Sequence, residues 1–184
     1  MRIVGGRLRG RALAAPKSAA IRPTADRLRE ALFNILLHAY GDPVTDARVL
    51  DLFAGTGALG IEALSRGAAF ALLVDDAAPA RALMRDNVTT LGLGGTARIF
   101  RRDATGLGDV HPIEPFSLVF LDPPYRQGLA ERALVSAQAG KWLLPDALAV
   151  VEEAADAGFA PPAGFAELER RRYDETELIF LRTA

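Results

Sequence analysis

The stretch DLFAGTGALG, residues 51–60, decides the fold of this chain. It begins inside an apolar run, residues 49–53, and carries glycines spaced G-x-G-x-x-G at positions 55, 57 and 60. Glycine permits the tight turn that joins a strand to a helix, and it lets a ligand approach the backbone closely. A helical pattern follows over residues 57–65. The stretch therefore predicts a strand, a glycine-rich turn and a helix. Glycines at this spacing often serve only the strand-to-helix turn, so a nucleoside ligand is indicated only in combination with an acid on the next strand.

Working outward, the chain after residue 48 alternates short apolar runs with helical patterns. The other expected strands cover residues 70–74, 97–101, 116–121 and 148–151, and the other expected helices cover residues 78–91 and 130–139. This alternation predicts a parallel sheet with helices on both faces. Residues 165–173 and 177–181 face each other across a short turn with no helix between them. They predict an antiparallel hairpin that closes one edge of the sheet.

The first part of the chain has a different character. Residues 2–15 place Gly5-Gly6 and Gly10 between apolar stretches, which is typical of a small β-hairpin or a basic loop. A linker and then a helix over about residues 24–38 follow. We therefore expect a basic N-terminal arm over residues 1–23 and one α/β domain over residues 24–184.

Composition narrows the possible functions. The 184 residues suit about one domain, and no apolar run reaches the ~20 residues of a membrane span. The absence of cysteine excludes disulfides, thiolate catalysis, zinc fingers and iron–sulfur clusters, and two histidines cannot form a His-rich metal site. No apolar signal core follows the N-terminus. We expect a cytoplasmic monomer that binds no metal and no membrane.

The net charge of −1 conceals two unlike parts. Residues 1–30 hold eight basic and two acidic residues, a charge of +6, whereas the other 154 residues hold 14 basic and 21 acidic residues, a charge of −7. A basic segment on an acidic body indicates an anion-binding arm. The candidates for phosphate contacts are Arg7, Arg9, Arg11, Arg22 and Arg27. Arg22 and Arg27 have an alternative role near the cleft or as ordinary helix-surface charges.

Acidic residues at the ends of the predicted strands suggest which nucleoside binds. Asp75 ends the second strand, 20 residues after Gly55, where a carboxylate can accept both hydroxyls of a ribose. Asp51 would repel the pyrophosphate of a dinucleotide but suits a cation such as S-adenosylmethionine. Asp103 follows the third strand and could accept from an adenine amino group. The alternative is that these are solvated acids at strand ends.

The turn Asp122-Pro123-Pro124-Tyr125 directly follows the strand expected over residues 116–121. Two prolines fix two φ angles, so the turn is stiff. The Asp122 carboxylate and the Pro123 carbonyl are two acceptors for the N–H groups of an exocyclic amine, and they would stabilise the positive charge that develops on its nitrogen. Tyr125 could stack on a base, a contact of roughly 1–3 kcal/mol. The alternative is an ordinary proline-rich turn.

Together these motifs resemble the class I S-adenosylmethionine-dependent methyltransferases, and more closely the RsmD family, bacterial enzymes that methylate guanine N2 in small-subunit (16S) ribosomal RNA. The similarity runs nearly end to end. Its blocks are residues 2–6, 9–11, 22–27, 29–34, 51–60, 62–68 and 122–125. The cofactor motif is common to many methyltransferases, whereas the block over residues 22–33 combined with the later motifs is more specific. The resemblance implies a Rossmann-like α/β fold with a mostly parallel seven-stranded sheet.

The resemblance also implies roles for individual residues. The target amine would be held by Asp122, Pro123 and Tyr125. The cofactor, S-adenosylmethionine, would be bound by Asp51, Phe53, Gly55, Gly57, Asp75, Asp103 and Ala104. The family often shows acid-x-Asp after the second strand, whereas this chain has Asp75-Asp76-Ala77, so Asp76 could take the place of Asp75. The expected partner is 16S ribosomal RNA within an assembled or assembling small subunit.

Three other interpretations compete with this one. A DNA or protein amino-group methyltransferase would share residues 122–125, although DNA enzymes usually carry a further target-recognition domain. A nicotinamide-dependent oxidoreductase explains the glycines but not Asp51 or the proline turn. A non-catalytic RNA-binding module explains the arm but not the two motifs. The absence of cysteine favours direct in-line transfer to nitrogen over a covalent base adduct.

Overall fold

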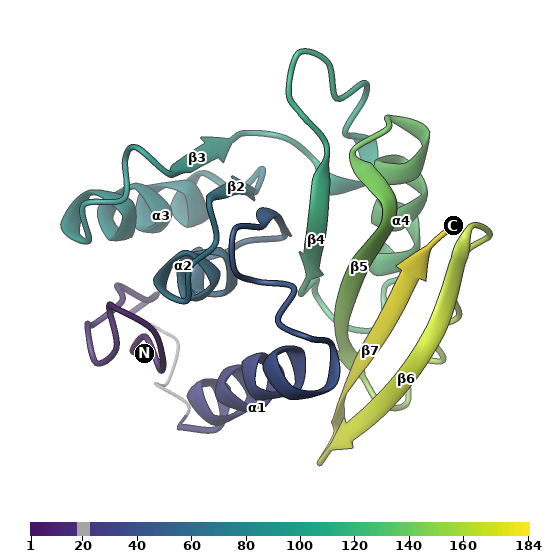
Figure 1. The fold of residues 1–184 in the computed structure, drawn as a ribbon, viewed down its shortest axis with the longest axis horizontal. Coiled ribbons are helices and arrows are strands. Elements are labelled where there is room, and N and C mark those ends of the chain that lie inside the picture. Colours follow the sequence, from purple (N-terminus) through teal and green to yellow (C-terminus); the bar gives the residue numbers. More distant parts are fainter. Residues whose placement is uncertain (18–22) are drawn as a thin grey trace.

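The computed structural model describes residues 1–17 and 23–184, with the side chains of Pro23 and Thr24 left aside. Helices and strands alternate along the chain (Figure 1). The elements are α1 (Pro23–Ala39), β1 (Arg48–Leu52), α2 (Ala58–Ser65), β2 (Phe70–Val74), α3 (Ala78–Thr90), β3 (Ala97–Phe100), η1 (Ala104–Gly106), β4 (Phe116–Leu121), α4 (Leu129–Ala139), β5 (Leu143–Ala154), β6 (Phe165–Tyr173) and β7 (Thr176–Thr183). Within the described residues, no helix combines the length and apolarity that a membrane crossing requires.

The seven strands form one sheet in the order β3-β2-β1-β4-β5-β7-β6. The first five strands of this order are parallel, and β7 runs antiparallel to both β5 and β6. The predicted parallel sheet with a terminal hairpin is therefore confirmed. Because β7 lies between β5 and β6, the hairpin extends the sheet beyond β5 instead of merely capping its edge.

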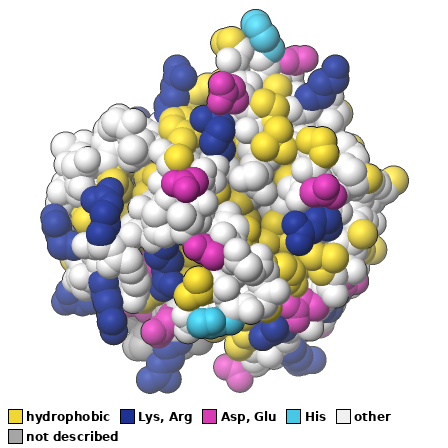
Figure 2. Space-filling view, viewed as in Figure 1, with side chains coloured by type: hydrophobic (Ala, Val, Ile, Leu, Met, Phe, Trp, Pro, Cys, Tyr) yellow, Lys and Arg dark blue, Asp and Glu magenta, His cyan; other side chains and the backbone are white. Residues whose placement is uncertain are grey.

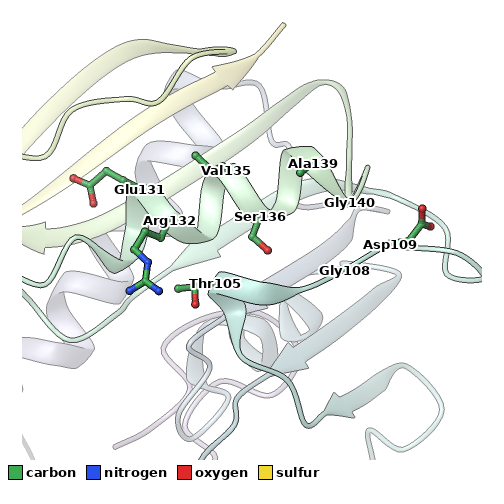
Figure 3. Close-up of a pocket in the computed structure, with 9 residues that line it drawn as sticks. All are labelled: Thr105, Gly108, Asp109, Glu131, Arg132, Val135, Ser136, Ala139 and Gly140. Atoms are coloured by element: carbon green, nitrogen blue, oxygen red, sulfur yellow. The ribbon is translucent and has the colours of Figure 1, made fainter.

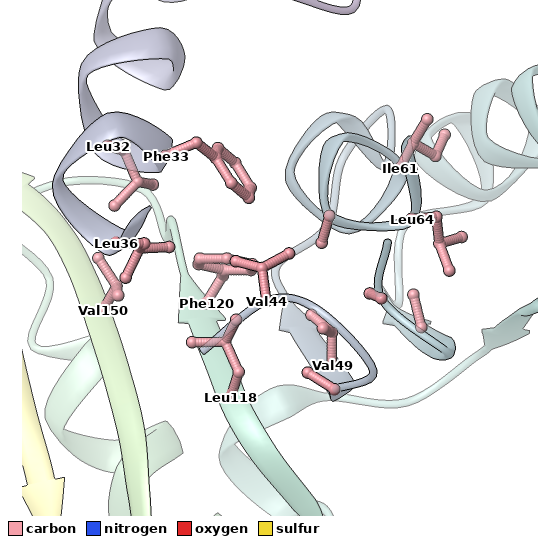
Figure 4. Close-up of a cluster of buried hydrophobic side chains, with 14 of the residues drawn as sticks. Leu32, Phe33, Leu36, Val44, Val49, Ile61, Leu64, Leu118, Phe120 and Val150 are labelled. Carbon is pink, nitrogen blue, oxygen red and sulfur yellow. The ribbon is translucent and has the colours of Figure 1, made fainter. Parts of the chain in front are cut away.

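Helices cover the two faces of the sheet unequally. Alternation along β4 sends Leu118 and Phe120 to one face and Val119 and Leu121 to the other. The first face packs against α1, α2 and α3, and Figure 4 shows Phe33 of α1 near Phe120, with ring centroids 5.6 Å apart. The second face packs against α4 and the η1 region. The core thus has two layers, and α1 forms part of the larger one.

The N-terminal segment, residues 1–15, is folded onto the domain. Ile3, Leu8 and Leu13 are buried in the same core layer as α1, α2 and α3. The expected hairpin is reduced to a single antiparallel bridge between Arg2 and Ala12, because the chain turns around the end of α2 instead of pairing along its length. The division of the chain at residue 23 stays a prediction, since it borders residues 18–22, which lie outside the described part.

One further element, β5, differs in detail from expectation. β5 begins at Leu143, five residues before the apolar run that starts at Leu148. Leu143 pairs with Phe116, and an irregularity then shifts the register before Leu148 pairs with Leu118. This early part of β5 is partly exposed, so its sequence lacks the apolar signature of a buried strand. Trp142, the residue before β5, packs beneath the sheet and is fully buried, with its indole N–H donating to the Gly108 carbonyl at 2.8 Å.

Substitution of Gly6 can measure how tightly the N-terminal segment packs against α2. The φ of Gly6 is +75°, and a Cβ placed there would lie 2.0 Å from the backbone oxygen of Ser65 in α2. Gly10 has a similar φ of +85° but open space around it, so it is a matched control for backbone strain alone. We expect Gly10→Ala to cost about 1–2 kcal/mol of unfolding free energy and Gly6→Ala to cost clearly more. Urea unfolding measures both, and equal losses would show that the close packing is unimportant.

Candidate active site

Five acidic residues lie in a row at the carboxyl edge of the parallel strands. In sheet order they are Asp103 after β3, Asp75 after β2, Asp51 near the end of β1, Asp122 after β4 and Glu152 near the end of β5. Ligands of open α/β sheets bind outside this edge, where the strand order reverses. In this sheet the reversal falls between β1 and β4. The acid row is therefore placed where such a fold binds its ligand.

The inner cavity, of about 270 Å³, lies between α1 and the glycine-rich turn. Its acidic lining residues are Asp51, Asp122 and Glu152. Met1 and one side of α1, including Leu28 and Arg29, complete the wall. The N-terminal segment and α1 thus form a roof over the strand ends.

The outer cavity, of about 390 Å³, continues along the same edge toward β3. Its lining includes Asp75, Asp103, Ala104 and Pro124, and it shares Phe53 and Asp122 with the inner cavity. Asp76 also lines the outer cavity, beside Asp75. The two cavities meet at Phe53 and Asp122.

The turn after β1 is built around backbone conformations that favour glycine. Gly55 and Gly57 have φ values of +60° and +80°. A Cβ on Gly57 would crowd Leu73, whereas the space beside Gly55 is open. Phe53 also adopts a positive φ, +58°, which is costly for a bulky residue and is characteristic of functional sites.

Two acids of the row stabilise this turn directly. The Asp51 carboxylate accepts the Gly60 N–H at 2.9 Å, and the Asp75 carboxylate accepts the Gly55 N–H at 3.0 Å. Asp75 also accepts the Ala77 N–H at 2.9 Å. Each of these acids therefore has a structural role that is independent of any ligand.

Asp51 is the most deeply buried acid of the row, with 1% of its surface exposed. Burial raises its pKa to about 7; the hydrogen bond from Gly60 opposes this shift, and the nearby charge of Asp75 adds to it. A carboxylate in this state is stabilised by a positive charge placed in the inner cavity. Asp51 therefore fits a cationic ligand.

Asp103 is held differently, at the start of η1. Its carboxylate accepts both the hydroxyl and the backbone N–H of Thr105, at 2.7 and 2.8 Å. Both hydrogen bonds lower the pKa of Asp103, and the bond from the hydroxyl has the larger effect. It is therefore a fixed, charged acceptor at the far end of the outer cavity.

The turn after β4 is clamped to the end of β5. The Tyr125 hydroxyl donates to Glu152 at 2.5 Å, and the Arg126 N–H donates to the buried carboxylate of Glu153 at 3.0 Å. Pro123 is buried and Tyr125 is half-buried, whereas Asp122 is open to the cavities. The clamp and the two prolines give the turn the stiffness that its sequence predicts.

Asp122 keeps access to solvent but is enclosed by the protein surface of both cavities and by like charges. Desolvation raises its pKa well above the usual range, and the charges of Glu152, Asp51 and Glu153 act in the same direction. Desolvation also raises the pKa of Glu152, against the hydrogen bond from Tyr125. Two adjacent carboxylates with raised pKa values bind protons and cations more readily than isolated ones.

Glu152 is the member of the row that sequence reasoning missed. It directly follows the apolar run Leu148–Val151, just as Asp75 and Asp122 directly follow theirs. That position was the available signal, because parallel strands bring their carboxyl ends to one edge. No motif marked Glu152, and its bond to Tyr125 joins residues 27 positions apart.

The arm arginines lie away from the cavities. Arg7, Arg9 and Arg11 are exposed on the turn of the N-terminal segment, near Ser65 at the end of α2. The eight residues of α2 place this turn about 12 Å from the glycine-rich turn. Figure 2 shows basic side chains gathered on the left side of the view, where Figure 1 places the N-terminal segment and α3.

The other two predicted phosphate contacts fall elsewhere. Arg27 is exposed on α1 and lines the hairpin cavity, a volume of about 890 Å³ between α1 and the β6–β7 turn. Leu28 lines both this cavity and the inner cavity. Arg22 lies outside the described residues.

A further cavity, of about 580 Å³, opens between α4 and η1 (Figure 3). It shares Thr105 and Arg132 with the outer cavity but contains none of the five acids of the row. Its size alone does not connect it with the chemistry of the strand ends.

The sheet order, the glycine-rich turn and the terminal antiparallel strands define a Rossmann-like class I methyltransferase fold. A candidate methyltransferase structure from Escherichia coli superposes with a TM-score of 0.83 at 36% identity, covering 100% of this chain and 97% of that one. The family model described as conserved hypothetical protein 95 matches residues 1–182.

Curated relatives identify the family more closely. Ribosomal RNA small subunit methyltransferase D of Escherichia coli K12 is 43% identical over 159 residues, which cover 86% of this chain and 77% of the relative. The protein of the same name in Haemophilus influenzae is 34% identical over 173 residues, covering 93% and 88%. The chain therefore belongs to the RsmD family, as its motifs indicate.

The buried Asp51 carboxylate predicts a specific pH dependence of stability. The pKa of Asp51 is about 7 in the fold, against about 3.9 in an unfolded chain. The folded state thus holds the proton more tightly. The resulting stabilisation is complete below about pH 4 and is lost as the pH rises through 7. Each unit of difference between the folded and unfolded pKa values corresponds to about 1.4 kcal/mol of unfolding free energy.

We expect Asp51→Asn to reduce this dependence while keeping an acceptor for the Gly60 N–H. Between pH 5 and pH 8 the wild type should lose more unfolding free energy than the variant, by a few kcal/mol. Urea unfolding of both proteins at the two pH values measures the difference. Parallel losses would contradict the assignment of Asp51 as the titrating group.

Proposed function

We propose that this protein is an S-adenosylmethionine-dependent methyltransferase that modifies N2 of one guanosine in 16S ribosomal RNA, within an assembled or assembling small subunit. The observation that carries the proposal is the position of Asp122, where the two cavities of the acid row meet. The two joined cavities can then hold a cationic cofactor, while the turn Asp122-Pro123-Pro124-Tyr125 binds an amine. The family supplies the RNA substrate, since the curated relatives are named as ribosomal RNA methyltransferases.

The residues present suit S-adenosylmethionine. The raised pKa of Asp51 favours a cation in the inner cavity, and the open space beside Gly55 leaves room for a ligand against the backbone. Asp75 and Asp103 place carboxylates along the outer cavity, where they can accept from a ribose and an adenine amino group. We therefore assign cofactor binding to Asp51, Phe53, Gly55, Gly57, Asp75, Asp103 and Ala104.

The residues of this chain contribute to catalysis by positioning the target amine and by stabilising the positive charge that develops on its nitrogen. S-adenosylmethionine supplies the methyl group on a sulfonium, and transfer breaks a sulfur–carbon bond, forms a nitrogen–carbon bond and releases one amine proton. Asp122 and the Pro123 carbonyl accept the amine N–H groups, which exposes the nitrogen lone pair and stabilises its developing charge. The released proton passes to Asp122 or to water. The Tyr125 hydroxyl is engaged by Glu152, so its contribution to the base is the face of its ring.

The base must leave its stack to reach Asp122. The hairpin cavity adjoins the inner cavity at Leu28, and Arg27 lies on its rim. This side offers a path for a flipped nucleotide, with Arg27 near its phosphate. Arg7, Arg9 and Arg11 would contact the RNA backbone farther from the target.

Asp122→Ala should separate binding from transfer. Calorimetry should show S-adenosylmethionine affinity within a few-fold of wild type, because Asp51, Asp75 and Asp103 remain. Methyl transfer should fall by about 10²–10³-fold, as for loss of one aimed polar group. Asp86→Ala, which removes an exposed acid on α3, should change neither. Unchanged turnover in Asp122→Ala would refute the site, and binding of NAD in place of S-adenosylmethionine would refute the cofactor.

Mass-spectrometric mapping of 16S ribosomal RNA identifies the substrate. A strain lacking this protein should lose one N2-methylguanosine. The wild-type gene should restore the modification, and the Asp122→Ala gene should not. A full set of N2-methylguanosines in the deletion strain would overturn the proposed substrate.

Neutralising the arm should weaken RNA binding in a salt-dependent way. Changing Arg7, Arg9 and Arg11 to Gln should reduce the slope of log K against log[salt] by about 0.7–0.9 for each phosphate that the variant no longer neutralises. Lys141→Gln, an exposed cation beyond α4, is the control and should leave the slope unchanged. If the triple variant keeps the wild-type slope in filter-binding titrations, the arm does not bind phosphate.

A further inference from the structure

Glu152 stands beside Asp122 at the edge of the sheet, and the proposed transfer at Asp122 makes no use of it. β4 and β5 are parallel with Leu121 opposite Val151, so the residues that follow them are neighbours. Both acids line the inner cavity. Strand alternation puts Glu152 on the same face as Val150, the face covered by α1. A molecule held at Asp122 therefore lies within the surroundings of Glu152.

Tyr125 fixes this second carboxylate. Its hydroxyl donates to Oε1 of Glu152 at 2.5 Å and also lies 3.5 Å from the Thr176 hydroxyl. Desolvation raises the pKa of Glu152, and this donated hydrogen bond opposes that shift and restricts rotation of the side chain. The bond engages one of two carboxylate oxygens, and an ionised carboxylate has about four acceptor sites. Glu152 thus retains acceptor capacity for a ligand.

Two neighbouring acceptors select one pattern on a nucleobase. Guanine presents its N2 amine next to the N1–H, which are donors side by side. Adenine and cytosine place an unprotonated ring nitrogen, an acceptor, next to their exocyclic amines. An ionised carboxylate can only accept, so a second carboxylate would pair with guanine N1–H and repel the ring nitrogen of the other two bases.

We propose that Glu152 accepts the N1–H of the target guanine while Asp122 accepts from its N2 amine, so that Glu152 determines selectivity for guanine. The inference rests on the proposed function, because it concerns the base that is methylated. Under this proposal Glu152, at the edge of β5, recognises the base, which is a role separate from methyl transfer. The turn after β4 holds the reacting nitrogen, and Glu152 reads the adjacent ring position.

A base analogue tests this role directly. 2,6-Diaminopurine keeps the 2-amino group of guanine but has an acceptor at N1. Small-subunit RNA prepared by splinted ligation, with guanosine or 2,6-diaminopurine at the mapped target, is assembled with small-subunit proteins and methylated in vitro. The wild type should prefer guanosine by about 10²-fold or more in kcat/KM, as sites built to bind a donor reject analogues that lack it.

Glu152→Gln should reduce this preference to about tenfold or less, because the amide can donate to the analogue's N1. The affinity of the Glu152→Gln variant for S-adenosylmethionine, measured by calorimetry, should stay within about twofold of the wild-type value. This result would confirm that the variant is folded. Glu114→Gln, at an exposed glutamate that lines none of the four cavities described, should keep the full preference.

Each other outcome is decisive. If Glu152→Gln lowers activity on both particles equally, Glu152 only positions Tyr125 and the inference fails, while the proposed function stands. If the wild type methylates both particles with equal kcat/KM, the inference fails and the proposed function stands. This outcome does not depend on any variant. If the wild type methylates neither particle, the proposed function fails, and the inference fails with it.

Discussion

The buried carboxylate of Glu62 organises the roof of the inner cavity. It is fully buried in α2 and accepts the N–H groups of Val4 and Gly5 at 3.0 and 2.8 Å. It also accepts from the guanidinium groups of Arg29 and Arg66, at 3.4 and 2.9 Å. One side chain therefore ties the N-terminal segment and α1 to the helix that follows the glycine-rich turn. Loss of one partner of such a buried cluster would leave uncompensated charge, which makes the arrangement of these three segments interdependent.

This constraint fixes the segments that wall the inner cavity. Five parallel strands supply acids along an open edge, and an open edge alone would leave them in water. Arg29 reaches from α1 to Glu62, and it holds α1 where Leu28 lines both the inner cavity and the hairpin cavity. Under this roof, desolvation raises the pKa values of Asp51 and Asp122. Met1 and α1 wall the inner cavity, so this enclosure acts on Asp51, Asp122 and Glu152 and not on Asp75 and Asp103 of the outer cavity.

The sequence predicted the strands, the helices and four acids of the row, because hydrophobic periodicity and glycine spacing are local signals. Other features depend on contacts between distant segments. Glu62 receives donors from as far as 58 residues away, and Glu152 is recognisable only once β5 lies beside β4. The early part of β5 was missed because its residues are partly exposed and Asp146 adopts a φ of +58°. Local patterns therefore located the edge of the sheet, whereas its roof and its fifth acid required the tertiary structure.

A row of five acids is an unexpected surface for a protein proposed to bind RNA, and the arrangement of charge resolves the conflict. The acids line the inner and outer cavities, where in the proposed function only a cationic cofactor and a neutral base need to enter. The exposed arginines of the N-terminal segment lie at the other end of α2, which extends about 12 Å from the glycine-rich turn. A phosphate backbone can follow these cations while one base enters the cavities, and charge repulsion then keeps phosphates out of the acid row. The small net charge thus conceals a separation of basic and acidic side chains, and in the proposed function this separation would select which part of a nucleotide reaches Asp122.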